Sequence, residues 1–506
     1  MGRMQNAARN IGWGLIYKFS SLFLAFLARV IMIHTLGAEY LGLNSLFTSV
    51  LRILCLADLG FGTAITYSMY KPTAEHDTEM ICALLNLYRK IYRTIGTVIL
   101  AAGLVLMPFI DGLIAGDVPE GVNIYLLFFI YLLNTSVSYL FFAYREAVLT
   151  AHQRNDIPSR INMATNTAKN LIQIVILVFW RNYYAFVIVI PVISIVTNLM
   201  VAYASKKYYP QYVCRGQVEP ELQKQITSKT IALLSVKITG VIYNSVDSVV
   251  ISSFLGLVVL AKYNNYYYVM DSVIAVIAMV YSSIISSVGN SIVTETSEKN
   301  YRDYMNLSFL NAWLIGWCTV CLFCLYQPFV ELWAGKELMF DFKVVVCFCI
   351  YFYVYQLKIV QSTYKDAAGL WKEDMWRSYA ANGFNLVMNI VLVQVIGVYG
   401  ILLSTILALL VITYPWQTWM IHKKLFHCSM RPYIIRLLIY TAVTAAACLV
   451  TQAVCMAVPA GGIGALLARG VICCIVPNLL FLLCSFWTKE FQWMQETAGR
   501  FYKKRK

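Results

Sequence analysis

The sequence predicts an all-α, polytopic membrane protein with about fourteen transmembrane helices. Its composition is 60% hydrophobic and only 13% charged, with a mean hydropathy of +0.66. A soluble domain has about a quarter charged residues. Apolar stretches of roughly 20 residues, the length that crosses about 30 Å of hydrocarbon, recur along the chain. Short motifs of the first half also return in the second half, which indicates an internal repeat.

The repeat has an almost constant offset of 219 or 220 residues. The matched segments are Tyr144-Arg145-Glu146-Ala147 with Tyr364-Lys365-Asp366-Ala367, Pro108-Phe109 with Pro328-Phe329, Leu36-Gly37 with Leu255-Gly256, and Lys18 with Lys237. In a membrane chain, two halves repeated in the same direction imply a pseudo-two-fold axis along the membrane normal. Such halves commonly share a site between them, which is the architecture of many transporters.

The repeat and the apolar stretches define the expected organisation. We expect an N-lobe of about six helices in 1–206, a polar cytoplasmic linker in 207–229, and a C-lobe of about six helices in 230–425. Two additional helices in 432–488 and a basic cytoplasmic tail in 489–506 follow. The expected spans centre, in order, near Leu22, Ile53, Leu100, Tyr131, Ile172, Val192, Val241, Val276, Leu314, Cys349, Val391, Leu407, Ala445 and Val476.

Lysine and arginine gather in alternate loops, which predicts that both termini are cytoplasmic. On this topology Arg469 falls in an outer loop. The formal net charge of +15 follows from this orientation and from the anionic inner leaflet, so nucleic acid is not an expected partner. No cleavable signal precedes the first apolar stretch, and we expect the amino terminus to be retained.

The sequence gives no indication of an enzyme. It has no phosphate-binding G-x-x-x-x-G-K-[ST] loop, no H-E-x-x-H and no G-x-S-x-G motif. Its 14 cysteines are scattered through apolar stretches and are interpreted as small packing residues, because paired C-x-x-C blocks are missing. We therefore expect no catalytic residue, no metal site and no cofactor.

Basic residues inside apolar spans are the candidate substrate site, because burying them in a bilayer is costly. Lys18 and Arg29 are eleven residues apart and share one helical face. On the next span Asn44, Thr48 and Arg52 follow at four-residue steps. Because polar stripes are disfavoured against lipid, we expect both faces to line a water-filled cavity.

The second half repeats this pattern with a different charge. Lys237 matches Lys18, whereas Arg29 and Arg52 match Ser248 and Asp271. The basic excess therefore belongs to the first half.

The carboxylates Asp58, Asp247 and Asp271 are candidates for ion or proton coupling or for salt bridges to neighbouring helices. A cationic cavity suits a phosphate or diphosphate headgroup, which arginine can bind in a bidentate manner. Tyr263, Asn264 and Tyr267 either contact sugars or belong to an interfacial aromatic belt.

Residues 29–93 resemble the Wzx-type lipid-linked oligosaccharide flippases of the multidrug/oligosaccharidyl-lipid/polysaccharide (MOP) superfamily. The segments that carry the resemblance are Leu36-Gly37-Ala38-Glu39-Tyr40-Leu41-Gly42-Leu43-Asn44-Ser45-Leu46-Phe47, Ala57-Asp58-Leu59-Gly60-Phe61-Gly62-Thr63-Ala64-Ile65 and Tyr67-Ser68-Met69-Tyr70-Lys71-Pro72.

The resemblance implies two six-helix lobes that work by alternating access, often followed by two further helices. It implies export of an undecaprenyl-diphosphate-linked oligosaccharide repeat from the inner to the outer leaflet of the bacterial cell membrane, for capsular, O-antigen-like or other surface polysaccharide. Membrane lipid and other polysaccharide-assembly proteins are the implied partners.

Three alternatives stay open. A peptidoglycan-precursor exporter of the same superfamily would keep the diphosphate and change the sugar-peptide part. A multidrug exporter would have a less basic, more apolar cavity. A membrane glycan polymerase or glycosyltransferase would need a large outer loop or a carboxylate-rich loop, and the sequence has neither.

Overall fold

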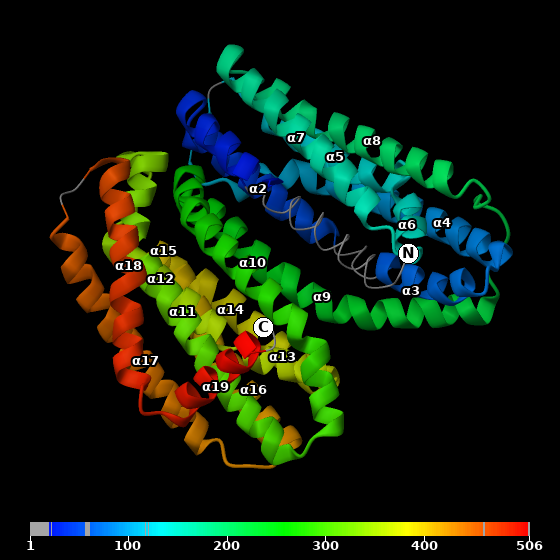
Figure 1. The fold of residues 1–506 in the computed structure, drawn as a ribbon. Helices are drawn as coiled ribbons and strands as arrows, with labels where there is room; N and C mark the ends of the chain where they lie inside the picture. Colours follow the sequence, from blue (N-terminus) through cyan, green and yellow to red (C-terminus); the bar gives the residue numbers. More distant parts are fainter. Residues whose placement is uncertain are drawn as a thin grey trace. The chain divides into compact units, whose positions relative to one another are not determined.

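The computed structural model describes residues 20–21, 23–55, 61–116, 118–119, 121–458 and 461–503. In these residues the secondary structure is helical and no strand occurs, which confirms the all-α class (Figure 1). Lys18 and Asp58 lie outside the described residues. The chain divides into two compact units, Met1–Ala261 and Lys262–Lys506.

Nine helices of the described part are long and apolar enough to cross a membrane, or ten with the bent pair Ile124–Leu140 and Ala143–Ala151. These helices support the expectation of a polytopic membrane protein. The expected number of about fourteen spans is not confirmed. The spans expected near Leu22 and Ile53 correspond to shorter elements, the helix Phe23–Thr35 and the 17-residue helix α2.

The first unit contains the helix Phe23–Thr35 and eight labelled helices. These are α2 (Ala38–Leu54), α3 (Phe61–Ala74), α4 (Thr78–Leu106), α5 (Ile124–Leu140), α6 (Glu146–Ala151), α7 (Asp156–Phe179), α8 (Tyr183–Tyr208) and α9 (Pro220–Leu255). Asparagine or aspartate side chains cap the amino ends of α4, α5 and α8, as these residues commonly do. Helix α5 packs between α4 and α8, and α9 packs on α2 and α3.

A close backbone contact joins α2 to the segment that follows α9. A Cβ built on Gly42 would lie 2.3 Å from the carbonyl oxygen of Leu257, which is backbone and cannot move aside. We expect Gly42→Val to lower the free energy of unfolding by about 1–3 kcal/mol, because adding side-chain atoms to a fully packed contact typically costs this much. Thermal unfolding of the purified protein measures this effect.

Gly383→Ala is the matched control, because it adds a Cβ to a helical glycine that has open space around it. We expect this control to keep or slightly raise the melting temperature, since alanine favours helix by about 1 kcal/mol over glycine. Equal melting temperatures of the Gly42→Val variant and the native protein would show that α2 does not approach Leu257 this closely.

The second unit begins inside α10 and ends with two further helices of membrane-spanning length and a final shorter helix. Its elements are α10 (Leu257–Thr294), α11 (Ser297–Ala334), α12 (Phe342–Leu357), α13 (Ile359–Ala367), α14 (Trp371–Ile396), α15 (Val398–Leu407), α16 (Tyr414–Ile421), α17 (Arg431–Met456), α18 (Gly462–Ser485) and α19 (Lys489–Lys503). Helices α17 and α18 pack on α11 and on each other.

Several positions matched by the sequence repeat have similar local structure. Gly37 and Gly256 each precede a helix and have φ of 112° and 84° with ψ of 171° and 176°, a conformation that favours glycine. Tyr144 and Tyr364 are both buried and lie in or beside a short helix that follows a long one. The copies differ at the repeated proline, because α4 ends before Pro108 whereas α11 continues through Pro328.

The beginning of the segment between the repeats packs on other parts of the first unit. Arg145 donates from Nη1 to the carbonyl oxygen of Tyr212 at 2.8 Å, and Asn86 donates from Nδ2 to that of Gly216 at 2.8 Å. The His152 ring also lies against this segment, and its burial lowers the pKa of the imidazole. The amino-terminal part of the expected linker is therefore held by residues of α4 and of the turns on either side of α6.

Candidate functional site

The helix Phe23–Thr35 carries Arg29, which is half-buried. Just before this helix, Ser21 accepts a hydrogen bond of 2.8 Å at Oγ from Asn166 Nδ2 of α7. Lys169, three residues after Asn166, is also half-buried. The chain just before the first helix is therefore hydrogen-bonded to α7 through Asn166.

Asn44 lies in α2 and takes part in a hydrogen-bond network inside the first unit. Its Oδ1 accepts from the hydroxyl of Tyr131 at 2.5 Å. The Tyr131 hydroxyl lies 3.2 Å from that of Tyr183, which donates to the carbonyl oxygen of Tyr40 at 3.2 Å. The Asn44 oxygen is thus used in packing α2 against α5 and α8, so Asn44 is a poor candidate for a direct substrate contact.

Thr48 and Arg52 follow on the next two turns of α2, and both side chains are exposed. Thr48 donates from Oγ1 to the carbonyl oxygen of Asn44 at 2.7 Å, and Arg52 lies in the last turn of the helix. The polar face formed by Asn44, Thr48 and Arg52, here called the α2 stripe, is therefore packed at Asn44 and exposed at Arg52. An uncovered guanidinium on an apolar helix is suited to binding an anion.

Helix α9 carries the residues expected from the second copy of the repeat. Asp247 and Ser248 are buried in this helix, which packs on α2 and α3. The backbone of Lys237 is helical, but its side chain lies outside the described residues.

In the second unit, Asp271 of α10 is exposed. It lies close enough to Tyr355 of α12 for the carboxylate charge to act on the tyrosine hydroxyl. Lys358 Nζ lies 4.0 Å from the centroid of the same Tyr355 ring, a cation–π distance. Tyr355 is therefore a neighbour of both a carboxylate and an ammonium group. The three-residue spacing of Tyr355 and Lys358 permits this contact on one helical face.

The tyrosines expected to contact sugar differ in exposure. Tyr263 is 2% exposed, and its ring centroid lies 5.3 Å from that of Phe348 of α12 and 5.9 Å from that of Tyr267. Burial leaves the Tyr263 ring without a free face, so this residue packs α10. Asn264 and Tyr267 are half-buried and keep part of their surface uncovered.

Two buried aspartates with basic partners were not predicted. In the first unit Asp156, at the amino end of α7, pairs with Arg154 at 3.0 Å and with Arg160 at 4.0 Å. In the second unit Asp374, in the first turn of α14, pairs with Lys365 at 3.1 Å and with Arg377. The sequence feature that could have pointed to the Asp374 pair is the repeated tetrapeptide, because it contains Lys365.

Residues 7–289 match the family described as polysaccharide biosynthesis protein, which is more than half of the chain. The chain belongs to this family. The matched region includes Arg29, Arg52 and the segments on which the resemblance was recognised. A comparison with curated protein sequences gave no significant match.

The fold of this chain is similar to the folds of solved membrane transporters. It matches the lipid II flippase MurJ in an inward closed conformation with a TM-score of 0.67, at 15% identity over 93% of this chain and 98% of that chain. An inward-facing multidrug resistance MATE family transporter of the MOP superfamily matches with a TM-score of 0.61, at 15% identity over 79% and 93% of the two chains.

A MOP superfamily transporter from Pyrococcus furiosus matches with a TM-score of 0.52, at 15% identity over 82% of this chain and 94% of that one. At these identities the likeness concerns the fold. The MOP-type fold is thereby confirmed for this chain, and family and fold together support a membrane flippase or exporter.

Proposed function

We propose that the protein is a flippase that moves an undecaprenyl-diphosphate-linked oligosaccharide repeat from the inner to the outer leaflet of the bacterial cell membrane, for surface polysaccharide synthesis. The observation that carries this proposal is the match to the polysaccharide biosynthesis family over 7–289, the region that contains Arg29 and Arg52. The lipid-linked glycan and membrane lipid are its partners, both termini are cytoplasmic, and the two lobes alternate access to the substrate.

The exposed end of the α2 stripe favours an anionic headgroup. Arg52 is uncovered, and Thr48 one turn earlier supplies a hydroxyl beside it. A unit charge pair at 4 Å contributes about 4 kcal/mol at an effective dielectric of 20, before desolvation. Contacts from Arg52 and Arg29 would therefore offset much of the cost of taking a diphosphate out of water.

The direction of transport follows from the same charge. An inside-negative membrane potential drives an anionic headgroup outward by about 2.3 kcal/mol per charge per 100 mV that it fully crosses. The potential can therefore supply the driving force, with Asp247 and Asp271 as candidate sites for an additional coupled ion or proton.

A panel of reconstituted substrates tests the proposal. Liposomes with the purified protein are given a diphosphate-linked oligosaccharide, a diphosphate-linked sugar-peptide of the peptidoglycan type, or a lipophilic cationic drug. We expect movement of the oligosaccharide lipid only. Preferential movement of the sugar-peptide lipid would replace the proposal with a peptidoglycan-precursor exporter, and drug transport alone would replace it with a multidrug exporter.

A further inference from the structure

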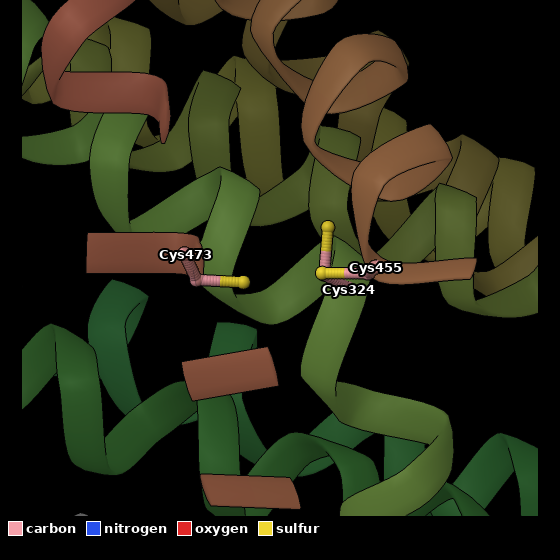
Figure 2. Close-up of side chains that lie close together, drawn as sticks. All are labelled: Cys324, Cys455 and Cys473. Carbon is pink, nitrogen blue, oxygen red and sulfur yellow. The ribbon is translucent and has the colours of Figure 1, made fainter. Parts of the chain in front are cut away.

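Three cysteines from three separate helices of the second unit converge in its interior. Cys324 lies in α11, Cys455 near the end of α17 and Cys473 in α18, and all three are buried. Their sulfur atoms lie within 4.8 Å of one another. Figure 2 shows Cys324 and Cys455 side by side, with the Cys473 side chain pointing toward them.

This spacing is close to that of a metal–thiolate centre. A cation bound at about 2.3 Å by three thiolates in one plane separates their sulfur atoms by about 4.0 Å. Small rotations of the three side chains would bring the sulfur atoms to that separation. From the sequence the cysteines were interpreted as scattered packing residues, whereas the fold brings these three together from helices far apart along the chain.

A basic residue accompanies the cluster. Arg469 was expected in an outer loop but lies inside α18, four residues before Cys473 and on the same helical face. It is within electrostatic range of Cys455 and Cys473, and its buried Nε has no hydrogen-bond partner. Among the described residues no carboxylate pairs with it.

We propose that Cys324, Cys455 and Cys473 bind one divalent thiophilic metal ion of the Zn(II) type and so fasten α17 and α18 to α11. On binding, each thiol loses its proton to water and forms one sulfur–metal bond. The site then has no net charge, because three thiolates balance one divalent ion and the Arg469 guanidinium. A neutral site suits a helix bundle inside a membrane, where unbalanced charge is costly. Soft thiolate ligands select this class of metal over Mg(II) or Ca(II).

Titration with Cd(II) tests this proposal, because thiolate-to-cadmium charge transfer gives an ultraviolet absorption band. The full-length protein is purified under reducing conditions after treatment with a chelator. We expect a band that saturates at one Cd(II) per chain and disappears in Cys324→Ala, Cys455→Ala and Cys473→Ala. Cys474→Ala is the matched control, since its thiol is exposed beside Cys473, and it should keep the full band.

Two further measurements separate binding from folding. Zn(II) should raise the melting temperature of the native protein and of Cys474→Ala, but not of the three cluster variants, since a ligand stabilises only the state that binds it. Arg469→Met should weaken Cd(II) affinity by about 10- to 100-fold, whereas Arg469→Lys should keep most of it. A full band in the triple cysteine variant, or no band in the native protein, would overturn the proposal.

Discussion

Replacing Arg52 by alanine is expected to abolish export of the lipid-linked glycan while the protein remains folded and inserted. The Arg52 side chain is exposed at the end of α2, so its removal should change the free energy of unfolding by no more than about 0.5 kcal/mol. The contact to a diphosphate that we propose for Arg52 would be worth more than this in surroundings of low dielectric constant. Glycan display at the cell surface, normalised to the amount of inserted protein, measures the effect.

Two companion variants sharpen this result. Arg93→Ala removes another exposed arginine of the first unit, on α4, and should leave display unchanged. Arg52→Lys keeps the charge but loses bidentate geometry, and we expect intermediate export. Normal glycan display by Arg52→Ala at normal protein levels would remove Arg52 from the substrate site.

Replacing Asp374 by alanine is expected to destabilise the second unit by about 3–5 kcal/mol, the cost of breaking a buried ion pair from one side. Asp374 is 4% exposed and binds Lys365 and Arg377, whose side chains are themselves largely buried. Its loss leaves Arg377 without a carboxylate partner among the described residues. Thermal unfolding of the purified variant measures the loss.

Glu373→Ala is the control for this second prediction, because it removes the preceding carboxylate, whose pair with Lys424 is partly exposed. Such surface pairs contribute about 0–1 kcal/mol, so this variant should melt near the native temperature. If Asp374→Ala melted at the same temperature as Glu373→Ala, the buried cluster would not be a stabilising feature of α14.

The fold class could be predicted from the sequence because it depends on average properties. A 60% hydrophobic chain with few charges must place its helices in a membrane, and the repeat made two similar halves the simplest arrangement. Gly37 and Gly256, one of the matched pairs, have similar backbone angles. The number of spans was harder to predict, since α2 carries charge and ends after 17 residues.

The site could be predicted only in part, because sequence spacing reports which residues share a helix face but not what that face meets. The stripe Asn44, Thr48 and Arg52 follows one helix, yet Tyr131, 87 residues further along the chain, takes the Asn44 oxygen. The three-cysteine cluster likewise depends on the packing of α17 and α18 against α11. Contacts of this kind come from tertiary structure, and no local pattern encodes them.

We infer that this protein carries an anionic, diphosphate-linked glycan across the membrane through a cationic site. The most direct test is a leaflet-resolved assay in liposomes with a fluorescent undecaprenyl-diphosphate oligosaccharide, with and without imposed proton, sodium and voltage gradients. The native protein should move the label to the outer leaflet faster under an inside-negative potential, and Arg52→Ala should not move it. Absence of movement by the native protein under every gradient would contradict the account.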